Sequence, residues 1–153
     1  SFNLRNFETA TGLAPAFVQD NQSLSYYGVM RGMHFQKAPF AQAKLLRVLQ
    51  GEVQDVVVDL RKDSPTFGEH FSIVLSAENK KQLFIPKGFA HGFLVLSDEA
   101  EFYYKCDEFY SPSYEASLLY NDPVLGIEWL VPENEIITSG KDKAASLLKD
   151  LEL

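Results

Sequence analysis

The sequence predicts an all-β domain, a β-sandwich or barrel, with short helices near its two ends. Apolar and polar residues alternate with a period of two along most of the chain, as half-buried strands require. Such segments recur roughly every ten residues, separated by turn-forming stretches such as "KDSPTFG", "SAENKK" and "NDPVLG". No long helical segments alternate with them, which disfavours a doubly wound α/β fold.

The expected elements can be placed along the chain. The stretch "GVMRGMHFQ" (28–36) has the apolar content of a buried strand, and "AKLLRVLQGEVQDVVVDLR" (43–61) predicts a hairpin that turns at Gln50-Gly51. In its second strand, Val56 and Val58 lie on one face and Asp55 and Val57 on the other. Further strands are expected at 70–76, 81–86, 91–97, 101–106, 115–120 and 127–130. Helices are expected at 5–12 and at 141–151.

Length and composition bound the function. A chain of 153 residues without a linker or an internal repeat predicts one domain, residues 1–153. Its net charge of -7 argues against a nucleic-acid partner, although a few cations in one cleft can still bind a small anionic ligand. The one cysteine, Cys106, excludes an intrachain disulfide. No long apolar run or signal-peptide pattern is present, so we expect a cytoplasmic protein without a membrane partner.

His34 is one of three histidines and stands inside a strand pattern. It could be a core histidine with both ring nitrogens hydrogen-bonded, or part of a site. The nearby cations Arg31 and Lys44 favour a site, because buried cations need partners and suit a ligand or reaction with negative charge. Strict alternation places Arg31 and His34 on opposite faces, so a shared site requires a β-bulge, which we expect at Gly32.

Five other titratable side chains allow either a structural or a functional interpretation. His91 begins an apolar strand and is either a pocket residue or a turn histidine, whereas His70 is expected at a strand edge without a role. In "EFYYKC", either Tyr103 or Tyr104 can point inward, where a phenol could donate a proton to a carbanion. Asp142 either favours the N-terminus of the last helix or holds a histidine and raises its basicity.

Several motifs together resemble one known family. The segments are "FVQDNQS", "GVMRGMHFQ", "AQAKLLRVLQGEVQDVVVDLRKDSPTFG", "IPKGFAHGFLVLSDEAEFYYKC", "YSPSYEASLLYNDP", "GIEW" and "SGKD". In order and spacing they resemble the dTDP-4-dehydrorhamnose 3,5-epimerase family over nearly the whole chain. The resemblance implies a cupin-type jelly roll, a homodimer, and no metal or cofactor. It implies conversion of dTDP-4-dehydro-6-deoxy-D-glucose to dTDP-4-dehydro-L-rhamnose by epimerisation at carbons 3 and 5.

The resemblance also implies catalytic roles. The histidine of the family's "RG-x-H" motif is the general base, which here is His34, and the aspartate of "KD" that supports it is Asp142. The tyrosine of "YK", Tyr104, is the implied general acid. Lys44 is implied to lie near the keto oxygen of the sugar.

The same resemblance implies the substrate-binding residues. Arg31 is placed near the diphosphate and His91 in the pocket, while Gln19, Asn21 and Tyr110 match positions that line the nucleotide-sugar site. Family members usually carry a further N-terminal segment with nucleotide contacts, which the sequence as given does not include. Smaller departures, such as "NQS" for the commoner "NHS", remove no residue of the implied chemistry.

Three alternatives remain open at this point. A related enzyme could epimerise a single carbon, which deuterium incorporation would reveal. A metal-dependent cupin usually needs two histidines as H-x-H, a carboxylate and a later histidine, whereas "HFQ" supplies one histidine. A non-catalytic sugar-binding module on the same fold gives no reason for Asp142 to touch His34, so the distance between them tests it.

Overall fold

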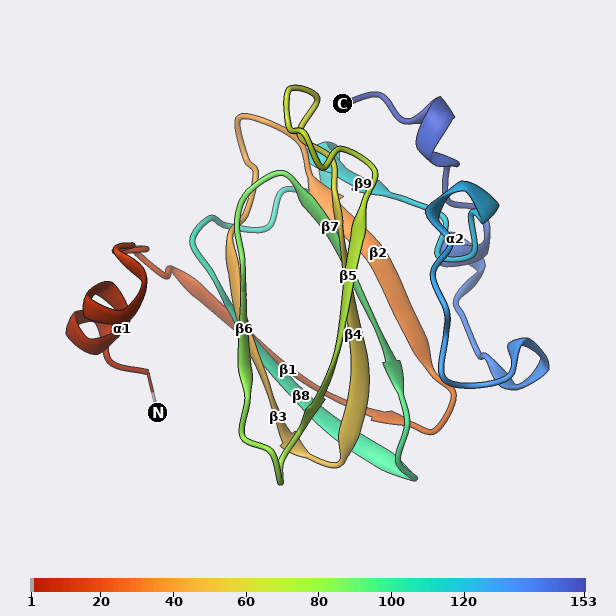
Figure 1. Cartoon of the computed structure of the whole chain (residues 1–153), viewed down its shortest axis with the longest axis horizontal. Coiled ribbons are helices and arrows are strands. Elements are labelled where there is room, and N and C mark those ends of the chain that lie inside the picture. The colour runs from red at the N-terminus through yellow and green to blue at the C-terminus, as the bar shows by residue number, and fades with distance from the viewer. Residues whose placement is uncertain (1) are drawn as a thin grey trace.

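The computed structural model describes residues 2–153 and contains two β-sheets that face each other (Figure 1). The four-stranded sheet has the spatial order β1 (Gln19–Tyr26), β8 (Glu99–Cys106), β3 (Lys44–Gln50), β6 (Gln82–Ile85). The five-stranded sheet has the order β5 (His70–Ser76), β4 (Glu52–Asp59), β7 (Phe89–Val95), β2 (Met30–Gln36), β9 (Glu115–Ser117). The strand pairs within both sheets are antiparallel, and the all-β jelly-roll prediction is confirmed.

Helices are short and lie outside the sheets. They are α1 (Leu4–Thr11), α2 (Gly140–Lys143) and the 3₁₀ turns Pro112–Tyr114, Pro123–Leu125, Glu133–Glu135 and Leu148–Asp150. The side chain of Asn3 caps the start of α1, and Gly12, at φ 73°, ends it as predicted. Figure 1 shows α1 beside β6 and α2 on the opposite side, next to β2. In the part of the chain that is described, no helix has both the length and the apolar character needed to cross a membrane.

The predicted hairpin at Gln50-Gly51 is wrong. Both strands exist, but β3 belongs to the four-stranded sheet and β4 to the five-stranded sheet. At Gly51, with φ 73°, the chain passes from one sheet to the other, and a Cβ there would lie 2.0 Å from the carbonyl oxygen of Glu99. Alternation identifies a strand but not its partner, because the pairing of β3 with β8 joins segments far apart in the sequence.

Strand β4 is buried on both faces, and its residues are divided between the two faces as the alternation predicted. Val56 and Val58 pack into a core between the five-stranded sheet and the C-terminal segment. Val53 and Val57 pack into a second core, between the two sheets. Asp55 lies on this inner face and is completely buried, so β4 carries a carboxylate into the space between the sheets.

Three predicted elements in the C-terminal part of the chain differ in the structure. Residues 127–130 form no strand, because the buried side chain of Gln54 takes the place of a neighbouring strand: its Nε2 donates to the carbonyl of Glu128, 2.8 Å away, and its Oε1 accepts from the N–H of Leu130, also 2.8 Å away. The helix expected at 141–151 is shorter and ends at Lys143. The chain that follows returns to the sheet, where Ser146 forms a parallel bridge with Leu118. The strand expected at 115–120 likewise ends at residue 117.

Candidate active site

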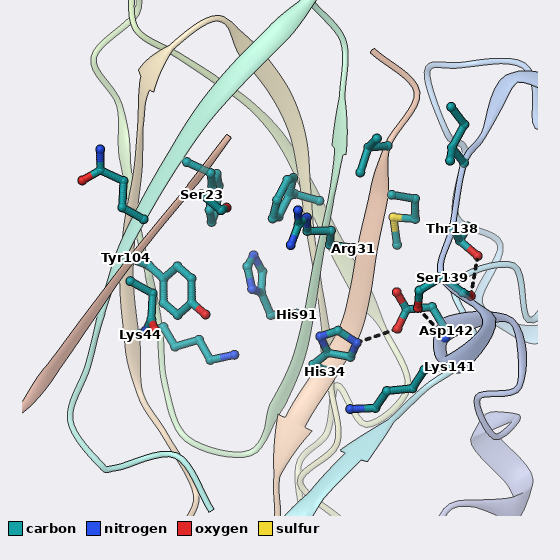
Figure 2. A pocket seen from close by; sticks show the side chains of 17 residues that line it. Ser23, Arg31, His34, Lys44, His91, Tyr104, Thr138, Ser139, Lys141 and Asp142 are labelled. Carbon is teal, nitrogen blue, oxygen red and sulfur yellow. Dashed lines mark hydrogen bonds and ion pairs between the residues drawn. The ribbon is translucent and has the colours of Figure 1, made fainter. Parts of the chain in front are cut away.

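A cavity of about 710 Å³ is lined by residues from both sheets and from the segment that carries α2 (Figure 2). Strand β2 contributes Arg31 and His34, and β7 contributes His91. From the four-stranded sheet, Lys44 of β3 and Tyr104 of β8 reach into the same space. The cavity therefore gathers titratable side chains that are widely separated in the sequence.

The bulge predicted at Gly32 is present. Arg31 lies opposite Phe93 and His34 opposite His91, so β2 has one residue more than β7 between these pairs. This extra residue brings Arg31 and His34 to the same side of the sheet. Gly32 adopts φ +128°, and a Cβ there would lie 2.5 Å from the Cα of Gly92. Only glycine fits this position without displacing the neighbouring strand.

His34 and Asp142 form a hydrogen-bonded pair. The Nε2 atom of His34 lies 2.7 Å from Oδ1 of Asp142, whose side chain is 5% exposed. Asp142 also lies in the first turn of α2, where its N–H donates to Oγ of Ser139, so both interpretations of Asp142 hold. A carboxylate that accepts from Nε2–H leaves the lone pair on Nδ1, which is then the nitrogen able to take a proton.

Tyr104 and Lys44 are neighbours on the four-stranded sheet. The Nζ atom of Lys44 lies 5.8 Å from the centre of the Tyr104 ring. Burial raises the pKa of Tyr104 to about 12, although the positive charge of Arg31 opposes the shift. Burial lowers the pKa of Lys44, against the attraction of negative groups that include Asp55. The phenol of Tyr104 therefore stays protonated at neutral pH and can act as a proton donor.

A second histidine–carboxylate pair lies at the cavity. Nε2 of His91 is 2.9 Å from Oδ2 of Asp55, and both side chains are buried. Burial raises the pKa of Asp55, while the charges of His91 and Lys44 oppose the shift. The sequence interpretation placed Asp55 on the strand face opposite Val56 and Val58 but missed this pairing. A carboxylate beside the valine run in "VQDVVVD" was the available signal.

A chain of polar contacts runs beside the cavity. Asn21 lines the cavity, while Gln19 and Tyr110 are not among the described residues that line it. Gln19 connects Asn21 to Tyr110: its Nε2 donates to Oδ1 of Asn21 at 3.2 Å, and its Oε1 accepts from the N–H of Tyr110 at 3.1 Å. The Tyr110 hydroxyl in turn donates to Oε2 of Glu115 at 2.9 Å, and Glu115 pairs with Lys141, which lines the cavity. We call these five residues the rim chain.

The remaining candidates lie where the sequence placed them or nearby. His70 is exposed on edge strand β5, and its Nδ1 lies 2.9 Å from the carbonyl oxygen of Leu125. Tyr103 points to the outer face of its sheet, where its hydroxyl donates to Asp20 at 2.9 Å, so Tyr104 is the inward tyrosine. Arg31 donates from Nε to Oγ of Ser25 at 3.1 Å. Among residues 2–153, no group of three His, Cys, Asp or Glu side chains is placed to hold a metal ion.

Some cavity residues were missed by the sequence analysis. Ile137, Thr138 and Ser139 line the cavity from the segment before α2. A parallel bridge between Val29 and Ile137 holds this segment beside β2. Apart from the motif "SGKD", the local sequence carries no periodic signal for such a contact, because it joins the start of β2 to a distant irregular segment.

Comparison with known proteins agrees with this geometry. The family model described as dTDP-4-dehydrorhamnose 3,5-epimerase matches residues 1–150. The dTDP-4-dehydrorhamnose 3,5-epimerase of Salmonella typhimurium strain LT2 is 54% identical over 151 residues, which is 97% of this chain and 80% of that protein. The corresponding protein of Escherichia coli K12 is 48% identical over 152 residues, 99% of this chain and 81% of that protein.

Solved structures of epimerases also match this chain. The dTDP-6-deoxy-D-glucose-3,5-epimerase of Legionella pneumophila, in complex with dTDP-4-keto-L-rhamnose, matches with a TM-score of 0.95 and 50% identity over 99% of this chain and 80% of that one. A 3'-monoepimerase from Streptomyces bikiniensis, in complex with dTDP-quinovose, matches with a TM-score of 0.89 and 36% identity over 97% of this chain and 74% of that one. This chain is therefore a member of the dTDP-4-dehydrorhamnose 3,5-epimerase family of enzymes.

Proposed function

We propose that the chain converts dTDP-4-dehydro-6-deoxy-D-glucose to dTDP-4-dehydro-L-rhamnose by inverting carbons 3 and 5 of the sugar. The observation that carries the proposal is the placement of His34 and Tyr104 on opposite sheets around one cavity, with Asp142 held against His34. Inversion at a carbon requires a base on one side and an acid on the other. The relatives named above, and the ligand bound to the Legionella protein, support this substrate.

The carbonyl at carbon 4 acidifies the protons on carbons 3 and 5, and Nδ1 of His34 removes one of them. Asp142 stabilises the resulting imidazolium, and the electron pair of the broken C–H bond moves onto the carbonyl oxygen. The Lys44 ammonium stabilises this enolate, a kind of contribution worth about 3 kcal/mol. Tyr104 then donates a proton to the opposite face of the carbon as the carbonyl re-forms. Each acid or base supplies about 10²- to 10⁴-fold of rate.

The other side chains suit substrate binding. Arg31 is proposed to contact the diphosphate, and His91 to line the sugar site. Asn21, Gln19 and Tyr110 are proposed to border the nucleotide. The cations Arg31, Lys44 and Lys141 all line the cavity, so a dianionic diphosphate can bind there despite the net charge of -7 of the chain.

We further propose a homodimer that works in the cytoplasm. Leu24 and Tyr26 project from the outer face of β1 and are 48% and 61% exposed, which supports a partner on that face. Cys106 is a free, buried thiol, in keeping with a reducing compartment. Size-exclusion chromatography with light scattering measures the assembly, and a monomer at micromolar concentration would contradict the first point.

The experiment that tests the function is turnover of dTDP-4-keto-6-deoxyglucose in deuterated water. Deuterium at carbons 3 and 5 of an L-configured product supports the proposal. Label at carbon 3 alone would identify a single-carbon epimerase, and exchange at neither carbon would favour a sugar-binding module. Stoichiometric iron, manganese or zinc in the purified protein would instead support a metal-dependent cupin.

A pair of histidine variants tests the assignment of the base. His34→Ala should lose turnover while it keeps its affinity for dTDP, because the ring is proposed to act on the sugar and not to contact the nucleotide. His70→Ala, which lies outside the cavity, is the matched control and should keep both. Near-parental turnover by His34→Ala would show that another group is the base.

A further inference from the structure

Tyr110, a member of the rim chain, lies in a segment without regular secondary structure. Residues 107–111 connect the end of β8 to the 3₁₀ turn Pro112–Tyr114 and form neither helix nor strand. Backbone hydrogen bonds of a helix or sheet therefore do not fix their conformation. The side chain of Tyr110 is 53% exposed, so packing in a core does not fix it either. Other contacts must hold this residue in its place beside the cavity.

Gln36 holds the backbone on both sides of Tyr110. Its Nε2 donates to the carbonyl oxygen of Phe109 at 3.2 Å, and its Oε1 accepts from the N–H of Ser111 at 2.7 Å. Nε2 also donates to the carbonyl oxygen of Phe40 at 2.6 Å. These partners allow one orientation of the amide, because the flipped group would turn its oxygen toward two carbonyl oxygens. Both hydrogens of Nε2 and the oxygen of the amide are thus bonded to the backbone.

The Gln36 side chain is fixed by burial and by strand β2. Gln36 is 6% exposed and is the last residue of β2, where it pairs with Glu115 of β9. It lies two residues after His34, so the two side chains project from the same face of the sheet. His34 lines the cavity, whereas Gln36 lies outside the lining that the structure describes. A buried amide with three backbone partners suits a role in holding the surroundings of the site rather than the ligand.

The loop that joins β2 to β3, residues 37–43, is fastened to the same segment. The rings of Phe40 and Tyr114 pack together, with their centroids 4.7 Å apart. Gln36 bonds to the carbonyl oxygen of Phe40 and to the segment around Tyr110, so it connects to both stretches of chain. The two stretches therefore form one unit at the end of β2, with the Gln36 amide between them.

We propose, on the basis of the function proposed above, that Gln36 is a positioning residue for the nucleotide end of the substrate. By holding Phe109 and Ser111, it sets the conformation of Tyr110 before the substrate binds. A binding surface that is already ordered loses less conformational entropy on binding, so this preorganisation contributes to affinity for the nucleotide. Gln36 acts through Tyr110 and touches neither the reacting carbons nor the proposed acid and base, so its effect falls on KM and not on kcat.

The test measures the dissociation constant for dTDP by calorimetry, and kcat and KM for dTDP-4-keto-6-deoxyglucose. Gln36→Met keeps the approximate volume of the side chain and removes its three hydrogen bonds. If the segment then holds its binding conformation for about a tenth of the time, the apparent dissociation constant rises about tenfold. We expect this increase in both Kd and KM, with kcat at saturating substrate within about twofold of the parental value.

Gln54→Met is the matched control. Gln54 is 1% exposed. Its amide likewise makes three hydrogen bonds, with Ser72, Glu128 and Leu130. These bonds hold a different segment, and Gln54 is not part of the described cavity lining. Both variants should lose similar stability in urea, but only Gln36→Met should lose affinity for dTDP. Equal changes of Kd in the two variants would show a general effect of stability and would overturn the proposal.

Tyr110→Ala separates this inference from the proposed function. It should weaken dTDP binding at least as much as Gln36→Met does. The double variant should bind no more weakly than Tyr110→Ala alone, because both changes act through the same ring. Parental affinity in Tyr110→Ala would refute both the proposed contact of Tyr110 with the nucleotide and the role of Gln36. Weakened binding in Tyr110→Ala with parental affinity in Gln36→Met, or additive losses, would overturn the role of Gln36 alone.

Hydrogen exchange of the Tyr110 amide tests the same point without a ligand. The N–H of Tyr110 donates to Oε1 of Gln19 at 3.1 Å and not to Gln36. Its exchange should still be about tenfold faster in Gln36→Met, because residues 107–111 are then released together, and should stay parental in Gln54→Met. Unchanged exchange in Gln36→Met would overturn the proposal by showing that the segment keeps its conformation without Gln36.

Discussion

Gly32→Ala should damage both the stability and the activity of the protein, because the bulge in β2 has no room for a side chain. The added Cβ would lie 2.5 Å from the Cα of Gly92 and 2.7 Å from the carbonyl oxygen of His91, both backbone atoms of β7. The φ of +128° costs a non-glycine residue about 2 kcal/mol, and overpacking costs about 2 kcal/mol more. A total of about 4 kcal/mol is a large part of the 5–15 kcal/mol that stabilises a typical domain.

Urea unfolding followed by circular dichroism measures the loss of stability, and deuterium exchange into the substrate measures the loss of activity. Because Arg31 and His34 share the cavity only through the bulge, kcat should fall by about a hundredfold, as for other small misplacements of catalytic groups. Gly126→Ala is the control: Gly126 has φ +60° but nothing within 4 Å of an added Cβ, so it isolates backbone strain of about 1 kcal/mol. Equal losses in the two variants, with parental kcat in Gly32→Ala, would refute the reasoning.

Three further substitutions test individual side chains. Tyr104→Phe should exchange substrate protons with solvent but form little inverted product, because the base remains and the acid is lost; normal inversion would contradict its role. Lys44→Met should be more stable than the parent at neutral pH, since burial lowers the folded pKa of Lys44 below its unfolded value. Between the folded and the unfolded pKa of Lys44, the unfolded state binds more protons, so the parent gains stability as the pH rises. The stability difference between Lys44→Met and the parent should therefore shrink toward pH 10, and a difference in urea midpoints that grows with pH would argue against this prediction. Asp59→Asn should cost about 3 kcal/mol at pH 7, because the buried carboxylate of Asp59 accepts hydrogen bonds from Arg61, which depress its pKa. That contribution is fully present above the unfolded pKa of about 4, and is lost only as the pH falls through the strongly depressed folded pKa, so the difference between parent and variant should narrow steadily below about pH 4, and a constant difference would count against the assignment.

Most strands could be predicted because each apolar strand carries its own signal. Val56 and Val58 alternate with Asp55 and Val57, and the structure places these two sets in the two cores. The partner of each strand could not be predicted in the same way. The adjacent strands joined at Gly51 belong to different sheets, and only the shape of the whole domain decides this.

Within the site, the features that depend on one short segment were predictable. The odd spacing of Arg31 and His34, with Gly32 between them, was enough to predict the bulge. The contact of His34 with Asp142 joins residues 108 positions apart. The pattern of the sequence left two interpretations of Asp142 open, and only the family resemblance indicated that Asp142 supports His34. The pairing of His91 with Asp55 had only a weak signal, a carboxylate beside a run of three valines.

Strand β1 was not predicted from periodicity, although the family resemblance named Gln19 and Asn21 as site residues. The segment "QDNQSLSY" alternates in burial, but its inward residues Gln19, Asn21 and Ser23 are polar and only partly buried. The usual strand signal assumes that the inward face meets an apolar core. In β1 the inward face meets a solvent-accessible cavity and its rim, so polar residues occupy positions that a packed core would fill with valine or leucine. In a jelly roll that encloses a polar ligand, a polar segment next to a predicted strand is therefore itself a candidate strand, and its inward residues are candidates for the binding site.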